Sequence, residues 1–140
     1  FAEKLVKNEN AKVIDSWLKS TNQSFYTIEY SLSSMTGNHT KQGKFNPDFF
    51  IKTSDEEMEY ITVVEIKDDQ DYSDLNSAKF KWATIHFKEL NNQLKKNRIK
   101  QRYNFHFLSP VNYDDFFEYL RNGKLAQGLF TSNLDIELNK

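Results

Sequence analysis

The hydrophobic residues of this chain recur with two different periods, and the period changes from one segment to the next. A period of about two residues predicts a strand, and a period of about 3.6 residues predicts a helix. The segments with the shorter period, which are the predicted strands, are Phe25–Leu32, Lys44–Lys52, Glu59–Lys67 and Asn104–Leu108. The segments with the longer period, which are the predicted helices, are Glu3–Lys19, Leu75–Lys95 and Tyr113–Asn122. The residues after Leu125 are ambiguous between the two periods.

Polar and turn-forming residues separate these segments and predict how they connect. The short polar turn Thr53–Glu57 predicts a hairpin between the second and third strands. Pro47 cannot donate a backbone hydrogen bond, so it marks an edge, a bulge or a bend. Ser33–Gly43 is a predicted loop, and so is the acidic stretch Asp68–Asp74, whose last two residues are suited to cap the next helix. The order helix, three strands, helix, strand, helix predicts an α/β fold with a mixed sheet of about four strands flanked by helices.

Length and composition add limits to this picture. The 140 residues, of which 38% are hydrophobic, fit a single domain (1–140) with one core. No apolar run approaches the roughly 20 residues that span a bilayer, so no membrane contact is predicted. The absence of cysteine excludes disulfides and thiolate metal sites, and it fits a cytoplasmic location. The chain begins without methionine or a signal peptide, which predicts a fragment or processed product of a longer protein.

The charged residues are unevenly distributed, although the net charge is only −1. Between Asp55 and Asp74 there are nine acidic residues and one lysine, and between Asn76 and Arg102 there are eight basic residues and one acid. One interpretation is two solvated faces of opposite sign. The other is a cation site beside a phosphate-binding surface.

Three charged residues lie at the ends of the most apolar predicted strands. Glu65 and Lys67 are two residues apart, so they project from the same face of the third strand. Asp48 follows Pro47 in the second strand, and it lies near Glu65 if these two strands pair. Two carboxylates in a partly buried site share a proton or bind a cation, and Mg²⁺ prefers such oxygen ligands. A solvated strand end that carries these charges by chance is the alternative explanation of Glu65 and Lys67 taken alone.

The same residues resemble a known family. "NPDFF" followed by "VVEIK" resembles the PD-(D/E)xK nuclease superfamily, which implies a restriction-endonuclease-like core. A narrower resemblance, carried by "FAEKL", "KFNPDFF", "VVEIK" and "NSAKFKWATIHFKEL", is to the C-terminal endonuclease domain of type III restriction enzyme restriction subunits. It covers residues Phe1 to Leu90. In those enzymes a helicase-like ATPase lies upstream in the same chain, so the resemblance implies ATP use only through that domain, and a modification or specificity subunit as a partner.

The resemblance assigns roles at the predicted site. It implies that Asp48, Glu65 and the main-chain carbonyl of Ile66 hold Mg²⁺, with Mn²⁺ as a substitute, and that Lys67 is the catalytic lysine. Many family members also use a glutamate of the first helix. Glu3 is the nearest candidate for that ligand, and Glu9 is its rival.

The predicted helix Leu75–Lys95 carries the residues that would contact DNA. Asn76, Lys79 and His86 stand where family members keep polar residues facing the site, and the seven-residue spacing of Lys79 and His86 places both on one helix face. A solvated helix residue is the alternative for each. His39 and His106 are isolated residues of a predicted loop and a predicted strand. Two histidines and two carboxylates in one small domain leave a transition-metal site open, although their spacing supports none specifically.

Three functions remain open from the sequence. The leading hypothesis is a Mg²⁺-dependent DNA endonuclease domain of a restriction enzyme subunit. The second is a catalytically silent nuclease-fold module that binds DNA or protein. The third is a plain interaction domain, which predicts that Asp48 and Glu65 lie far apart. One departure from the family concerns the DNA path. The acids that directly follow Lys67 would repel a DNA backbone unless they bind metal, turn away or lie beyond the duplex.

Overall fold

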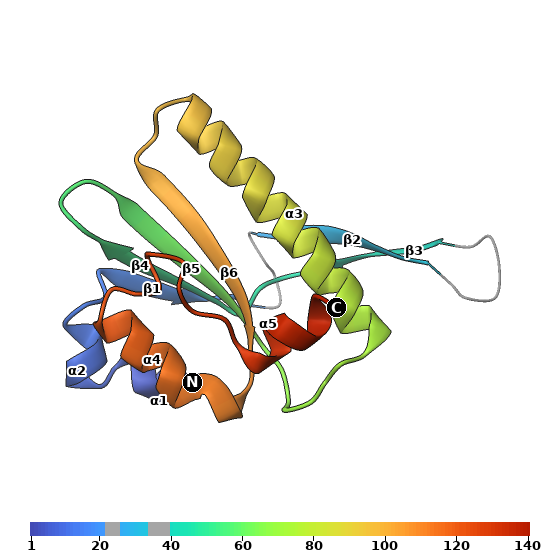
Figure 1. Cartoon of the computed structure of the whole chain (residues 1–140), viewed down its shortest axis with the longest axis horizontal. Coiled ribbons are helices and arrows are strands. Elements are labelled where there is room, and N and C mark those ends of the chain that lie inside the picture. Colours follow the sequence, from blue (N-terminus) through green and yellow to red (C-terminus); the bar gives the residue numbers. More distant parts are fainter. Residues whose placement is uncertain (22–25, 34–39) are drawn as a thin grey trace.

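The strands of this protein form a four-stranded mixed sheet and a separate two-stranded ribbon, with helices around them (Figure 1). The structure is a computed structural model that describes residues 1–21, 26–33 and 40–140. The strands are β1 (Ser16–Lys19), β2 (Ile28–Ser33), β3 (Thr40–Phe45), β4 (Phe49–Ser54), β5 (Glu59–Ile66) and β6 (Gln101–Leu108). The helices are α1 (Ala2–Leu5), α2 (Asn8–Ala11), α3 (Asp74–Lys96), the 3₁₀ helix η1 (Pro110–Asn112), α4 (Tyr113–Arg121) and α5 (Asn133–Leu138).

The four-stranded sheet has the order β1-β4-β5-β6. β4 pairs antiparallel with both β1 and β5, whereas β5 and β6 run parallel and are joined through α3. The predicted hairpin and the predicted crossover are both confirmed, and so is the mixed α/β fold. β2 and β3 form the antiparallel ribbon, which projects from the body of the molecule (Figure 1).

Alternation along β5 divides the core between the two faces of the sheet. Val64 and Ile66 face the cluster to which α1 and α4 contribute. Ile61 and Val63 face the cluster to which α3 and α5 contribute, together with the inner side of the ribbon. The predicted alternation of side chains along β5 is therefore confirmed. The residues after Val63 that share its face of the sheet point toward α3.

The predicted helices in the second half of the chain are confirmed to within a few residues. α3 begins after Ser73, whose side chain accepts a hydrogen bond of 3.2 Å from the backbone N–H of Asn76, and this contact is the predicted cap. Two lysines in its last turn complement the negative end of the helix dipole. α4 is followed by Gly123 with a φ of 72°, a conformation that glycine adopts at little cost. In the described part of the chain, no helix is long and apolar enough to cross a membrane.

The predicted helix Glu3–Lys19 is wrong in its second half. The chain forms two short helices instead, and Ser16–Lys19 becomes the strand β1. β4 would otherwise leave a row of backbone groups unpaired, and β1 satisfies them in the register Trp17↔Ile51. Tertiary pairing thus overrides the helical spacing of the apolar residues.

The boundaries of the first predicted strands also differ from the structure. Lys44–Lys52 is two strands rather than one, because the chain breaks at Pro47, which has no N–H for a ladder. Within the predicted loop Ser33–Gly43, the first residue belongs to β2, the last four belong to β3, and residues 34–39 lie outside the described residues. Within the ribbon Gly43 lies under the ring of Tyr30, and a Cβ there would come within 2.5 Å of that ring. Part of the predicted strand Phe25–Leu32 becomes β2, and Phe25 itself lies outside the described residues.

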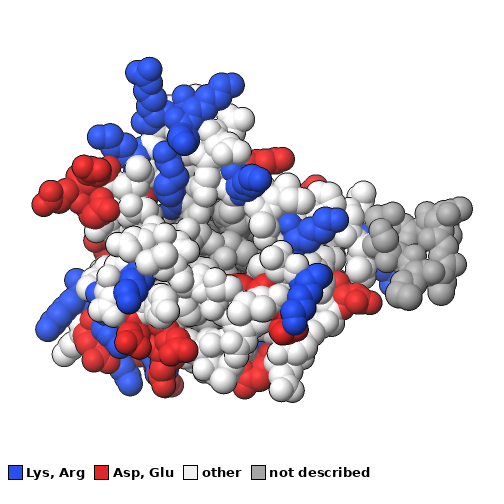
Figure 2. All heavy atoms as spheres, in the orientation of Figure 1, with Lys and Arg blue, Asp and Glu red and all other residues white. Residues whose placement is uncertain are grey.

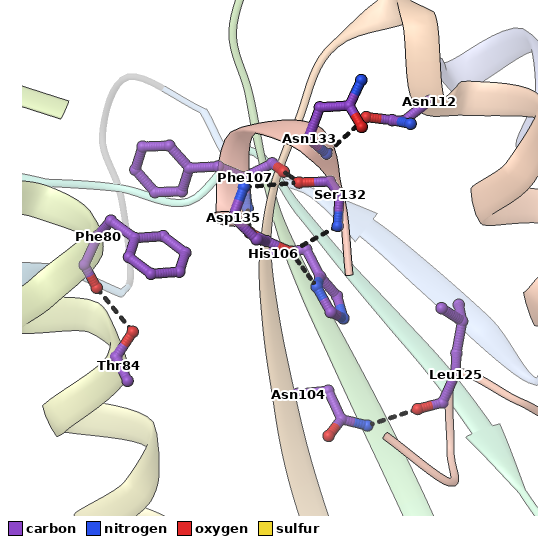
Figure 3. Close-up of polar contacts among 10 residues, drawn as sticks. All are labelled: Phe80, Thr84, Asn104, His106, Phe107, Asn112, Leu125, Ser132, Asn133 and Asp135. Carbon is purple, nitrogen blue, oxygen red and sulfur yellow. Dashed lines mark hydrogen bonds and ion pairs between the residues drawn. The ribbon is translucent and has the colours of Figure 1, made fainter. Parts of the chain in front are cut away.

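The ambiguous tail after Leu125 closes the outer edge of β6 (Figure 3). It forms α5, which begins with a capping box between Ser132 and Asp135. The same two side chains bond both backbone groups of Phe107, since the Asp135 carboxylate accepts its N–H at 2.9 Å and the Ser132 hydroxyl donates to its C=O. His106 Nδ1 completes the network at 2.7 Å from Asp135 Oδ2. The α5 capping residues therefore take the place of a neighbouring strand.

Candidate functional site

Asp48 and Glu65 meet where β4 begins and β5 ends. The register Phe49↔Val64 places the two residues opposite each other, and the backbone N–H of Asp48 donates to the carbonyl of Val64 at 2.9 Å. The Asp48 carboxylate in turn accepts the N–H of Ile66 at 2.7 Å. The proline before Asp48 ends the preceding strand, so the chain turns and enters β4 with the Asp48 side chain directed at β5. The predicted convergence of Asp48 and Glu65 is confirmed as geometry.

Lys67 stands beside this pair. Its Nζ lies 3.8 Å from Glu65 Oε2, and the two side chains leave the α3 face of the sheet as their spacing predicted. Glu65 is only 4% exposed, whereas the Lys67 side chain keeps 22% of its surface in contact with solvent. The site is therefore a buried acid with a lysine at its mouth.

The environment of Glu65 disfavours its charged form. Burial, followed by the hydrogen bond and the negative charge of Asp48, raises the pKa of this carboxyl to about 9, against the opposing effect of Lys67 and Lys79. The Glu65 carboxyl thus keeps its proton near neutral pH. A bound cation would replace that proton, because it stabilises both negative charges at once.

Lys79 reaches the same cluster from the second turn of α3. Partial burial and the nearby Lys67 lower the pKa of its ammonium group, while Glu65 and two aspartates oppose the shift. Its Nζ also lies 5.7 Å from the ring centroids of Tyr30 and Phe45, at the base of the ribbon. Lys79 therefore lies between the carboxyl pair and the ribbon. This position could not be predicted from the sequence, because the strand β3 was not predicted.

The other two helix residues with a predicted role in DNA binding lie in different surroundings. Asn76 is buried, and its amide donates at 3.2 Å to the carbonyl of Asp71, which ties the acidic loop to α3. His86 Nε2 lies 2.5 Å from the hydroxyl of Tyr26, in a groove between β2 and α3 of about 550 Å³. Burial lowers the pKa of His86. A DNA contact by either residue stays a prediction.

The acids that follow Lys67 partly turn away from the site. The Asp69 carboxylate accepts the backbone N–H of Val111 at 3.2 Å, so it points toward the loop after β6. This contact brings Tyr113 close, and burial followed by the charges of Asp69, Asp48 and Asp68 raises the pKa of its phenol. Tyr113 is a neighbour of the site that the sequence did not reveal, since its position depends on how α4 packs.

The two candidates for the ligand from the first helix lie on α1 and α2, and a metal contact by either stays a prediction. Glu9, the rival candidate, lies with its carboxylate 4.0 Å from Arg121. Glu3 is exposed on α1, whose neighbour Phe1 packs on the ring of Phe49 at 4.8 Å between centroids. Among residues 1–21, 26–33 and 40–140, no group of three or more His, Asp or Glu side chains is arranged to hold a metal.

The two remaining histidines lie apart from the site. His106, on β6, shares a hydrogen bond with Asp135 of α5, and His39 lies outside the described residues. The adjacent carboxyls of Asp48 and Glu65 fit a hard divalent cation, because Mg²⁺ is commonly held by one or two carboxylates while water and substrate phosphate complete its shell.

The basic stretch between Asn76 and Arg102 ends far from this site. Because β5 and β6 are parallel, Arg102 pairs with Tyr60 at the end of β5 opposite Glu65. Figure 2 shows lysine and arginine side chains gathered over the end of α3 and the start of β6, with an acidic group next to them over the β4–β5 turn. Of the basic side chains in this stretch that the structure describes, Lys79 is the one that acts on Glu65.

Comparison with protein-family models, with curated proteins and with solved structures finds no match to this chain. The site therefore has to be interpreted from its own geometry and chemistry.

Proposed function

We propose that this chain is a metal-dependent DNA endonuclease domain. The observation that carries the proposal is the contact of the buried Glu65 with the half-buried Asp48, with Lys67 Nζ 3.8 Å from Glu65. A buried acid beside a second carboxyl reduces the stability of a fold, and such an arrangement is commonly retained where it binds a cation or performs acid–base chemistry.

The residues divide into roles by their positions. Asp48 and Glu65, with the carbonyl of Ile66, would hold Mg²⁺ or its substitute Mn²⁺. When bound, such a cation lowers the pKa of water and stabilises charge on a phosphate. Lys67, at the mouth of the site, would orient the attacking water. Lys79, whose charge acts on Glu65, would contact a phosphate of the substrate.

The wider assignment rests on the sequence resemblance. We propose that the domain works as the cleavage part of a type III restriction subunit, with ATP used by an upstream helicase domain and with a modification or specificity subunit as partner. Sequence specificity would then come from those other parts. A cytoplasmic location belongs to the same proposal.

Cleavage of supercoiled plasmid DNA tests the function. The wild-type chain should nick the plasmid with Mg²⁺ or Mn²⁺ and not with EDTA, while Asp48→Ala and Lys67→Ala should lose at least about 100-fold in rate. Lys12→Ala removes an exposed lysine of another surface and should cleave at the wild-type rate. Equal nicking by all four proteins would indicate a contaminating nuclease and end the proposal.

A catalytically silent module is the second candidate. It is favoured by the small number of acids at the site, since two carboxylates alone can give weak metal binding. Calorimetry with Mn²⁺ separates the two functions. The nuclease requires Mn²⁺ binding that Glu65→Gln weakens, whereas the silent module requires no Mn²⁺ binding. A plain interaction domain expects Asp48 and Glu65 to lie apart, whereas they share a hydrogen bond.

A further inference from the structure

Lysines recur along one exposed side of α3 at an interval of seven residues. Lys81, Lys88 and Lys95 are all exposed, and seven residues are close to two helical turns, so their side chains form one stripe. The stripe is about 21 Å long, because each helical residue adds about 1.5 Å. Lysine and arginine side chains also lie over α3 between its two ends (Figure 2). Lys79 is two residues from Lys81 and therefore lies on nearly the opposite side of the helix.

The turn that joins α3 to β6 (residues 97–100) follows directly on this stripe. The N–H of Arg98 donates to the carbonyl of Lys95 at 3.1 Å, and the N–H of Ile99 donates to the carbonyl of Leu94 at 2.9 Å. These two bonds form the Schellman motif, which commonly ends a helix. They fix the backbone of the turn, so the exposed side chains of Arg98 and Lys100 project from a defined position.

Arg98 occupies a backbone position that favours glycine. Its φ is 58°, in the left-handed region, where the Cβ of an ordinary residue is unfavourable. The corresponding residue after α4 is Gly123. Among the described residues, the Arg98 guanidinium has no hydrogen-bond or ion-pair partner that would offset this strain. An unfavourable conformation without a compensating contact inside the chain indicates a role for the side chain outside it.

The stripe and the turn together form a basic ridge of five exposed cations, Lys81, Lys88, Lys95, Arg98 and Lys100. In the part of the chain that the structure describes, no acid forms an ion pair with any of them. Helix α3 contains only two acids, Asp74 and Glu89, and neither is three or four residues from a lysine. A helix face that is merely solvated usually mixes both signs of charge. The ridge is therefore suited to an anionic partner.

The shape of the ridge favours a linear polyanion. A nucleic-acid duplex carries about one negative charge per 1.7 Å of its axis, so about 12 phosphates lie along the length of the stripe. An extended acidic peptide carries at most one charge per about 3.3 Å and must also be ordered on binding. An anionic bilayer is a plane, and it would press against the acids beside the ridge, which include Glu89 and those of the β4–β5 turn (Figure 2).

We propose that the basic ridge binds the phosphate backbone of a nucleic-acid duplex that lies along α3. Contacts of this kind position a duplex without reading its bases. The contact is separate from the one that the proposed function gives to Lys79, whose charge acts on Glu65 from the other side of the helix. The inference does not rest on the proposed nuclease function. If that function holds as well, the ridge holds the chain on its substrate.

Fluorescence anisotropy with a short labelled DNA duplex tests the ridge over a range of salt concentrations. EDTA in the buffer keeps the DNA intact whether or not the chain is a nuclease. The triple variant Lys81→Gln, Lys88→Gln and Lys95→Gln should bind at least about tenfold more weakly than wild type. The slope of its log K against log salt should be smaller by about two to three, because three phosphate contacts are lost.

A second triple variant controls for net charge. Lys7→Gln, Lys12→Gln and Lys124→Gln remove three exposed lysines outside the ridge. Its affinity should stay within about twofold of wild type, because charges more than a Debye length from the duplex are screened. Urea denaturation confirms that both triple variants are folded.

Arg98→Gly separates binding from folding. Glycine relieves the backbone strain, so this variant should be more stable than wild type in urea, whereas the lost charge should reduce the salt slope by about one. Arg98→Ala removes the same charge and keeps the strain, so it should weaken binding equally without the gain in stability. Arg98→Gly that binds the duplex as wild type does would contradict a phosphate contact by this residue.

Other polyanions decide the kind of partner. The same proteins are titrated with polyglutamate and with vesicles of phosphatidylserine and phosphatidylcholine in equal parts. The proposal requires that wild type binds the duplex and that the ridge variant loses this binding. A wild type that does not bind the duplex, a ridge variant with the salt slope of the control variant, or a ridge effect confined to vesicles or polyglutamate would each overturn it.

Discussion

Glu65 sets the chemistry of the site at the scale of single residues. Its carboxyl is nearly inaccessible to water, it shares a hydrogen bond with Asp48, and two lysines stand nearby without fully compensating its charge. Its parity with Lys67 follows from strand periodicity alone, so this half of the site could be predicted from the sequence. Asp48 could only be placed conditionally, because its distance from Glu65 depends on the pairing of β4 with β5.

The raised pKa of Glu65 predicts a loss of stability as the pH rises. The folded state keeps this proton up to about pH 9, whereas the unfolded chain releases it near the ordinary pKa of 4.5. The stabilisation is fully present below the unfolded pKa and is lost as the pH rises to about 9. In the absence of metal, wild type should therefore be less stable at pH 8 than at pH 5 by urea denaturation.

Glu65→Gln should remove that dependence, because the amide does not titrate. The variant should exceed wild type in stability by about 1–3 kcal/mol at pH 8. Mn²⁺ at pH 8 should stabilise wild type and not the variant. Glu59→Gln serves as the control, since Glu59 is half-exposed and pairs with Lys52. If the free energy of unfolding changed with pH in the same way for wild type and Glu65→Gln, the result would contradict the buried environment assigned to Glu65.

α5 illustrates what decides structure at the scale of elements. Its six residues are too few to form a stable helix alone, and the sequence gives it no clear period. It forms because Ser132 and Asp135 cap it and at the same time bond the edge of β6. A serine followed three residues later by an acid is a capping signal that the sequence contained, but the partner on β6 could not be inferred from it.

Asp135→Ala should therefore destabilise the fold. The change removes a carboxylate that accepts hydrogen bonds from Phe107 and Ser132, and it leaves buried donors unsatisfied. The expected loss is about 2–4 kcal/mol in the free energy of unfolding. Urea denaturation measures it, and Glu137→Ala, which removes a more exposed acid of the same helix, should cost less than about 0.5 kcal/mol. Equal losses would mean that the network contributes little.

Charge is organised at the scale of the whole molecule. The acidic and basic stretches of the sequence do not face each other across the site, because the parallel pairing of β5 and β6 carries the basic turn to the far end of the sheet. Among the lysines that the structure describes, only Lys67 and Lys79 lower the pKa of Glu65 by their charge. The proposed function therefore gives phosphate contact to Lys79 and water orientation to Lys67, rather than either role to the whole basic stretch.

DNA binding by the cleavage-deficient Asp48→Ala protein should weaken steeply with salt, because released counterions drive the association. Adding Lys79→Gln should reduce the slope of log K against log salt by about one, as expected for one lost phosphate contact. Fluorescence anisotropy with a short duplex measures both slopes. Lys12→Gln in the same background should leave the slope unchanged, and an unchanged slope for Lys79→Gln would remove it from the DNA contact.

The sequence by itself determined the elements whose cause is local. The long amphipathic α3, the alternating β5 and the turn between β4 and β5 each carry their own period or turn chemistry, so the shared face of Glu65 and Lys67 followed as well. Tertiary structure decided β1, the ribbon, α5 and the meeting of Asp48 with Glu65. Each of these depends on a backbone or side-chain partner distant in the chain, and local periodicity contains no information about such a partner.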